Sequence, residues 1–511
     1  MELNEKSNSG HKRKRKSADN TLKTLRRLLA VISILLITPL FLDFTGTWQT
    51  LFGWMAKIQF LPAVLSLNVL VIVGLLVLTV LFGRLYCSVI CPLGIMQDGF
   101  AWFGKKAKKN RYSFSKAKSI LRYLMLALMI VSLIAGISSM VAILAPYSAY
   151  GRIVSSLLQP VWIWGNNLLA SWAENHDSYA FYQVEFWSKG YGVLVVAVTT
   201  LVILAILAWR NGRTYCNTIC PVGTVLGFFS RFALFRIVID KSKCVDCKLC
   251  SRNCKSACID IPAHQIDYSR CVACFDCIGK CNKGALSYRY VGLSPKSTDS
   301  TDNSNVDGSR RQFLTVGALL GTSVAASAAD KFVDGGLATI EDKKIPERKT
   351  RIAPPGAVSL RNLHQHCTAC QLCISACPNG VLRPQTDIEN FMQPESSYER
   401  GYCRPECTRC SDVCPAGAIK PLDAIGKSSV QIGHAVWVKA NCVPVTDGVE
   451  CGNCARHCPT GAITMVESDN GLKIPAVNTE KCIGCGACEN LCPARPFSAI
   501  YVEGHENHRF I

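Results

Sequence analysis

Two stretches of the sequence decide the fold: residues 244–254 read CVDCKLCSRNC, and residues 271–281 read CVACFDCIGKC. Both have the spacing C-x2-C-x2-C-x3-C, in which three neighbouring thiolates hold three irons of a [4Fe–4S] cluster and the fourth cysteine reaches the next cluster. This rule predicts two clusters. Their ligands are Cys244, Cys247, Cys250 and Cys281 for the first, and Cys271, Cys274, Cys277 and Cys254 for the second.

Two alternatives stay open around these motifs. The usual proline after the fourth cysteine is absent, since Lys255 and Asn282 stand there, and Cys258 could therefore replace Cys254. Zinc also accepts four thiolates, although zinc sites usually pair two distant C-x2-C motifs. The eight-cysteine pattern favours iron–sulfur clusters, and we expect residues 236–291 to form a small α+β domain of the bacterial ferredoxin type.

Long apolar segments fill the part of the chain before these motifs. A membrane span needs roughly 20 mostly apolar residues. Four segments reach or approach this length, and they predict a four-helix transmembrane bundle within residues 1–235: Leu28–Leu42, Phe60–Gly83, Ile120–Leu144 and Tyr191–Trp209.

The formal net charge is +20, and the basic residues are distributed unevenly around the predicted spans. Residues 1–27 and 84–122 each carry nine Lys and Arg, whereas residues 43–59 carry one and residues 145–189 carry two. Basic residues beside spans stay in the cytoplasm and attract anionic lipid headgroups. We therefore expect a bacterial cytoplasmic membrane protein with the domain at 236–291 on the cytoplasmic side, and no binding of nucleic acid.

A twelve-residue repeat lies at the cytoplasmic ends of two predicted spans. Residues 83–94 read GRLYCSVICPLG, and residues 212–223 read GRTYCNTICPVG. Each copy contains C-x3-C-P, and cysteines four residues apart share one helix face. The repeat predicts that Cys87, Cys91, Cys216 and Cys220 converge as a redox-active group. Whether they hold a cluster, another metal or disulfides stays open, and buried inert cysteines are the simpler alternative.

A second change of composition follows the ferredoxin-type motifs. Residues 292–308 are rich in Ser, Asp and Asn and predict a linker. Residues 309–330 begin with Ser309-Arg310-Arg311-Gln312-Phe313-Leu314 and continue with small, weakly apolar residues, as in a twin-arginine export signal. This segment would carry the following chain across the membrane, either as an anchor or as a cleavage site.

Sixteen cysteines lie beyond this segment, in four groups that each end in Cys-Pro. Disulfides are an alternative in an exported domain, but three groups crowd their cysteines in a way that suits cubane clusters better. Residues 331–511 therefore predict an exported four-cluster domain, which gives about six [4Fe–4S] clusters in all. The ligand groups are Cys367, Cys370, Cys373, Cys377; Cys403, Cys407, Cys410, Cys414; Cys442, Cys451, Cys454, Cys458; and Cys482, Cys485, Cys488, Cys492.

The two halves resemble two families. Residues 1–290 resemble NapH-type membrane ferredoxins, and residues 309–511 resemble NapG-type exported ferredoxins, with NosR-like proteins as further relatives of the repeat. The resemblance implies a unit that oxidises quinol and passes electrons to an exported reductase of nitrate or nitrous oxide, or to another exported carrier. By analogy with four-cluster ferredoxin subunits, the first exported motif exchanges its last cysteine with the fourth motif, and the second with the third.

Two functions of different classes are therefore carried forward. The first is a quinol dehydrogenase and electron conduit, with lipid, the quinol pool, an exported redox protein and a cytoplasmic redox protein as partners. The second is a redox-driven assembly factor for a metalloenzyme. The sequence contains no haem, dinucleotide or P-loop motif. Glu174, His176 and Glu185, in a predicted outer loop, are candidates for proton transfer at a quinone site.

Overall fold

The computed structural model describes seven stretches of the chain and two short strands, β5 (Val333–Asp334) and β6 (Ala338–Thr339), with side chains from Thr21 onward. The linker predicted at 292–308, apart from Gly292, and the twin-arginine segment predicted at 309–330 lie outside the described residues. The stretches are 3–107, 112–178, 180–185, 190–292, 342–387, 389–468 and 471–511.

Two helices in these stretches are long and apolar enough to cross a membrane. They are the Thr21–Leu42 part of α1 (Leu3–Leu42) and α12 (Tyr191–Asn211), which contain the first and fourth predicted spans. A third crossing exists if α9 (Ser138–Leu144) and the helix that starts at Pro146 form one broken span. The axes of these two helices are bent by 79° relative to one another. Length and composition thus support two or three spans and do not confirm the predicted four-helix bundle.

The second and third predicted spans are each divided into two helices, so neither is one long apolar helix. Phe60–Gly83 divides into α4 (Phe60–Leu65) and α5 (Val69–Phe82), because Leu67 has a φ of 53° and the side chain of Asn68 caps α5. Ile120–Leu144 divides into α8 (Ser119–Ala135) and α9, because Gly136 has a φ of 75°. Such left-handed residues end a helix.

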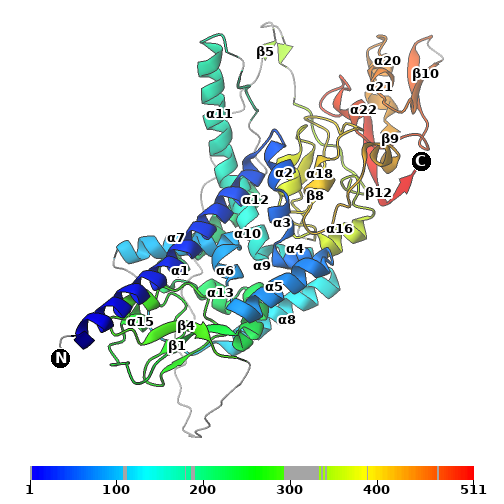
Figure 1. Ribbon diagram of the computed structural model, residues 1–511. Helices are drawn as coiled ribbons and strands as arrows, with labels where there is room; N and C mark the ends of the chain where they lie inside the picture. The colour runs from blue at the N-terminus through cyan, green and yellow to red at the C-terminus, as the bar shows by residue number, and fades with distance from the viewer. Residues whose placement is uncertain are drawn as a thin grey trace, which may run out of the picture.

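The segment predicted as an outer loop, residues 145–189, is largely helical. It forms α10 (Pro146–Ile153), a π-helical turn (Val154–Leu158) and α11 (Gln159–Glu174). Every residue of α10 is buried. Figure 1 shows α10 in the middle of the helical region, while α11 extends away from it. The loop prediction failed because the apolar residues of α10 pack inside the molecule instead of facing solvent.

The ferredoxin-type motifs form three similar units, each with a hairpin between two cysteine motifs. The first unit has β2 (Ile259–Asp260) paired with β3 (Gln265–Ile266), and its ends are joined by β1 (Phe235–Ile239) with β4 (Leu286–Tyr290). We call residues 235–290 the inner unit. It lies beside α1 and α13 (Thr214–Thr218), near the N-terminus in Figure 1.

The other two units make up the region beyond residue 342, which we call the outer region. One contains β7 (Leu382–Pro384) and β8 (Pro394–Ser396), and the other contains β10 (Ile463–Glu467) and β11 (Lys473–Val477). The last unit is closed by β9 (Val430–Trp437) against β12 (Ile500–Phe510). Figure 1 shows the outer region on the other side of the helices from the inner unit.

Candidate iron–sulfur centres

The first predicted ligand set lies together in the inner unit. Cys244, Cys247, Cys250 and Cys281 line one cavity, whose walls also include Ile261. The short helix α15 (Leu249–Arg252) carries Cys250, and the backbone N–H of Ala285 donates to Cys281 Sγ at 3.2 Å. Cys247 is exposed, so this centre lies close to the surface of the inner unit. The cavity brings together the four cysteines that the spacing rule assigns to one cluster.

Five thiols surround the second inner centre. Cys277 lies near Cys274, Cys254 and Cys271, which is the predicted set, and near Cys250 of the first set. Cys258 is also buried; its Sγ lies 3.6 Å from Cys254 Sγ and it is hydrogen-bonded to Cys271. The structure therefore keeps Cys258 in reach as an alternative ligand.

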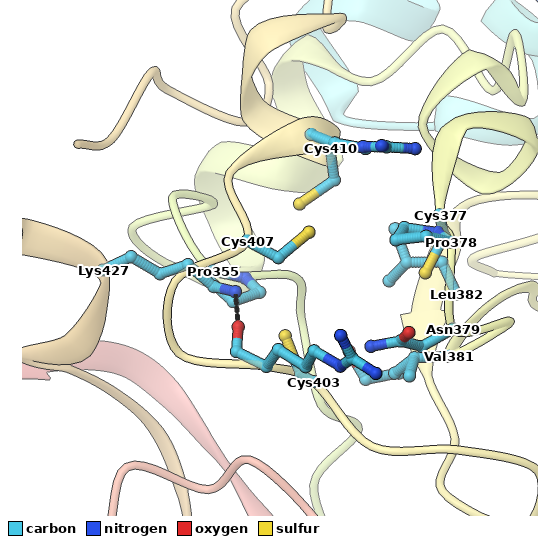
Figure 2. Close-up of a pocket in the computed structure, with 13 residues that line it drawn as sticks. Pro355, Cys377, Pro378, Asn379, Val381, Leu382, Cys403, Cys407, Cys410 and Lys427 are labelled. Atoms are coloured by element: carbon cyan, nitrogen blue, oxygen red, sulfur yellow. Dashed lines mark hydrogen bonds between the residues drawn. The ribbon is translucent and has the colours of Figure 1, made fainter. Parts of the chain in front are cut away.

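The outer thiols group differently from the predicted exchange. Figure 2 shows Cys377 of the first motif facing Cys403, Cys407 and Cys410 of the second, and these four line one cavity. Cys458 of the third motif lines a cavity with Cys482, Cys485 and Cys488 of the fourth. Exchange thus occurs between the first and second motifs and between the third and fourth. The β7–β8 and β10–β11 hairpins explain this correction, because each folds two consecutive motifs onto one another.

The remaining outer cysteines complete two further sets. Cys414 lies near Cys367, Cys370 and Cys373, and Cys492 lies near Cys442, Cys451 and Cys454. Burial raises the pKa of Cys370 to about 11, and the nearby Cys414 raises it as well. Thiolates in such buried places are stabilised when a metal binds them.

The outer sets follow one another without a gap. Cys373 of the first set is a neighbour of Cys410 in the second, and Cys403 of the second donates its N–H to the carbonyl of Cys485 in the third at 2.9 Å. Cys488 of the third set is a neighbour of Cys454 in the fourth. The outer region therefore presents a row of four thiol sets.

The repeat places its four thiols together in the helical region. Cys87 lies on α6 (Tyr86–Val89) and Cys216 on α13, while Cys91 and Cys220 precede α7 (Pro92–Lys106) and α14 (Pro221–Phe229). All four are free and no more than 6% exposed. Cys220 lies near Cys216, Cys91 and Cys87. The predicted convergence of the two copies agrees with this geometry.

A buried ionic network that the sequence reasoning missed joins the inner unit to the repeat. Lys255 Nζ lies 2.9 Å from Asp98 and 3.2 Å from Asp276, and Asp98 also binds Arg26 at 2.9 Å and Arg213 at 2.7 Å. Although burial raises the pKa of Asp98, these cations hold it well below its ordinary value. The Lys255 carbonyl accepts the Arg213 N–H at 2.8 Å. The only signal in the sequence was a lysine where proline is usual.

The candidates for proton transfer lie elsewhere. Glu174 and His176 are exposed at the C-terminal end of α11, and Glu185 is exposed in the segment that follows. His176 Nδ1 lies 2.9 Å from the Trp172 carbonyl, and Glu174 accepts a hydrogen bond from Gln183 at 3.3 Å. The structure does not bring these three residues to the described thiol sets.

Comparisons with known proteins agree with these sites. A family described as "4Fe-4S binding domain" matches residues 66–111 and 192–240, and one described as "4Fe-4S dicluster domain" matches residues 449–495. The methylamine utilization ferredoxin-type protein MauM of Methylobacillus flagellatus is 31% identical over 169 residues, which are 31% of this chain and 70% of that protein.

Two Escherichia coli proteins are similar as well. The ferredoxin-type protein NapF is 30% identical over 158 residues, 30% of this chain and 87% of NapF. The ferredoxin-type protein NapG is 31% identical over 157 residues, 28% of this chain and 66% of NapG. No solved structure matches the chain.

The thiol sets and these matches define the class of the protein: it is an iron–sulfur electron-transfer protein with several [4Fe–4S]-binding domains. More particularly, the chain belongs to the family of ferredoxin-type proteins that includes NapF, NapG and MauM.

Proposed function

We propose that the protein is a membrane-bound conduit that takes electrons from quinol and delivers them to an exported reductase of the nitrate or nitrous oxide type. The observation that carries the proposal is one continuous buried core. It contains Cys274 of the inner unit, the four thiols of the repeat, and Cys370 and Cys373 of the outer region. Thiol sets on the two sides of the helices are therefore connected through closely packed protein.

Helix α10 supplies the packing between the repeat and the outer region. Its Gly151 lies against the carbonyl of Cys370 and the ring of Phe41, so closely that a side chain would not fit. One turn later, Ser155 donates to Gln371 Oε1 at 2.8 Å. A row of centres at such contacts supports transfer across the roughly 30 Å hydrocarbon layer, which two separate ferredoxin-type regions could not bridge.

The proposal also includes the topology. The inner unit faces the cytoplasm, because the flanking Lys and Arg are concentrated on that side. The outer region faces the periplasm, carried there by the twin-arginine segment. Replacing Arg310 and Arg311 by Lys should then leave a reporter fused after Ile511 in the cytoplasm. Persistent export would contradict this topology, and replacement of Arg400, outside the signal, is the control.

Burial of the repeat favours a conduit over an assembly factor. Reduction of a disulfide on another protein by thiol exchange needs an accessible, reactive thiolate. Cys87, Cys91, Cys216 and Cys220 are instead enclosed by the helices. Electrons can reach such a site from neighbouring centres, whereas a partner protein cannot.

Anaerobic addition of quinol to the purified protein tests the proposal. The visible absorbance of the clusters should bleach as quinol reduces them. If quinol is not the donor, the absorbance of the oxidised clusters should persist. A quinol analogue with blocked hydroxyls is the control, because it binds lipid and detergent equally well but carries no transferable electrons. No bleaching with quinol, in protein that dithionite bleaches fully, would exclude quinol as the donor.

A further inference from the structure

We infer that Cys87, Cys91, Cys216 and Cys220 together hold one more [4Fe–4S] cluster, shared between the two copies of the repeat. Each of the two segments that match the "4Fe-4S binding domain" contains only two cysteines, so neither can supply four ligands alone. The inference goes beyond the six predicted clusters, and it does not depend on quinol being the electron donor.

The ends of two helices point at these thiols. Cys91 is the N-cap of α7 and Cys220 is the N-cap of α14, with the motif's proline in the first turn of each helix. The Gly223 N–H donates to Cys220 Sγ at 3.4 Å, and the Gly94 N–H donates to Cys91. Helix N-termini stabilise thiolates, because their free N–H groups carry partial positive charge.

Two arginines cross between the copies. Arg84 lies 3.8 Å from Sγ of Cys87 in its own copy and donates to the carbonyl of Cys216 in the other at 3.1 Å. Arg213 lies 3.9 Å from Sγ of Cys216 and donates to the carbonyl of Cys87 at 2.7 Å. The two guanidinium groups thus hold the copies together around the thiols with nearly the same geometry.

The last glycine of each copy makes room for the arginine of the other. A Cβ on Gly94 would lie 2.6 Å from Arg213 Nη1, and a Cβ on Gly223 would lie 2.7 Å from Arg84 Nη2. The repeated Gly-Arg, Cys, Cys-Pro and Gly positions therefore all serve one enclosed site.

The charge of this site requires an anion. Arg84 and Arg213 are fully buried, and Arg84 Nε and Arg213 Nη2 have no hydrogen-bond partner in the described part of the chain. Arg213 has Asp98 as its counterion, but no ion pair with a carboxylate is found for Arg84 among the described residues. A buried cation without a counterion is costly. Two neutral disulfides would leave Arg84 in that state, whereas a cluster held by four thiolates is an anion.

The position of the site favours iron over zinc. A zinc ion with four thiolates would carry a similar charge, but zinc has no redox chemistry. The thiols share their buried core with Cys274 on one side and Cys370 on the other. Arg84 also donates to the carbonyl of Ser269 at 3.0 Å, next to the second inner set. A redox cluster here would accept one electron from one neighbour and pass it to the other.

Metal analysis of the anaerobically purified full chain tests the inference. The protein should contain about 28 irons, four for each of seven clusters, and no stoichiometric zinc. The double variant Cys91→Ser/Cys220→Ser should contain about 24 irons and lose one signal from the electron paramagnetic resonance spectrum of the reduced protein. Ser88→Ala, in the same motif but without a thiol change, should keep the full iron content and every signal.

Two results would overturn the inference. About 24 irons in the unaltered protein, with one zinc lost in the double variant, would identify a zinc site. The same iron content, with four fewer free thiols than expected for the unaltered protein, would identify disulfides. The iron content of the unaltered protein decides between these outcomes, so the test holds even if the double variant does not fold. In Arg84→Gln the cluster should be harder to reduce, so that the ratio of reduced to oxidised cluster at a fixed potential is about tenfold lower. Arg84→Lys should restore this ratio.

Discussion

The inner unit and the outer region contact the same helices in opposite ways. The inner unit is held by buried charges, since Lys255 and Asp276 join a network with Asp98 and Arg26 of the helical region. The outer region is held largely by close packing and by hydrogen bonds to the backbone, such as that from Arg409 to the carbonyl of Phe44 at 3.4 Å. Gly151 packs against Cys370, and a Cβ on Gly417 would lie at an ordinary contact distance of 3.6 Å from Ser66.

This difference indicates two ways of fixing a redox centre against a helical region. Charged contacts place positive groups beside anionic clusters and bias their potentials, at the cost of burying ions. Close backbone contacts bring centres near one another without adding charge. We therefore expect the inner interface to be sensitive to changes of charge and the outer interface to changes of volume.

The largest effect is expected for Asp98→Asn. This change leaves Arg26, Arg213 and Lys255 without their shared carboxylate, and breaking a buried ion pair costs about 3–5 kcal/mol. Urea titration of the detergent-solubilised protein should show this loss, with faster amide exchange in residues 235–290. Asp240→Asn is the matched control, because its pair with Lys243 is exposed to solvent and such surface pairs add little to stability. Equal losses in the two variants would mean that the buried network does not hold the inner unit.

A smaller effect is expected for Gly151→Ala. The new Cβ would lie 2.5 Å from the Cys370 carbonyl and 2.8 Å from the Phe41 ring. Overpacking of this kind typically costs about 1–3 kcal/mol, and amide exchange should rise around residues 367–377. Gly165→Ala, in α11 with no atom within 4 Å of its Cβ, should be neutral or slightly stabilising. Equal amide exchange in Gly151→Ala and Gly165→Ala would show that the outer interface is not sensitive to added volume.

The sequence predicted the two inner thiol sets, and three ligands of each outer set, because their spacing is local. A hairpin between two consecutive motifs then brings the fourth ligand of each set. Two other features depend on contacts between distant segments, which periodicity does not report. They are the burial of α10 and the role of Lys255.

The partition of the outer ligands failed for a related reason. Analogy with four-cluster subunits paired the first motif with the fourth, but the length of the chain between motifs favours neighbours. Residues 378–402 and 459–481 each contain a hairpin that returns the chain to the preceding motif. The spacing between motifs therefore carried more information than the analogy did.

The smallest effect expected is a dependence on pH that is confined to the outer region. His508, on β12, is partly buried, and its two enclosed ring nitrogens have no hydrogen-bond partner among the described residues. Burial, with the nearby His505, lowers its pKa to about 4 from the ordinary 6.5. The unfolded chain therefore binds a proton below pH 6.5 that the folded chain does not. The free energy of unfolding of the outer region should therefore fall as the pH decreases from about 6.5 to about 4.

The inner unit should not respond in this window, which makes it an internal control. Although burial opposes the shift, Lys255 and the other nearby cations hold the pKa of Asp98 and Asp276 well below the ordinary value, so both carboxylates keep their charge down to pH 4. Amide exchange measured along one pH series should therefore quicken in residues 430–437 and 500–510 before it changes in residues 235–290. His508→Phe should weaken the response, because a neutral ring of similar shape has no proton to bind, while burial also lowers the pKa of His505 and His364 and leaves them a part of it. If the inner unit loosens first, or if the response is undiminished in His508→Phe, the acid sensitivity does not arise from this histidine.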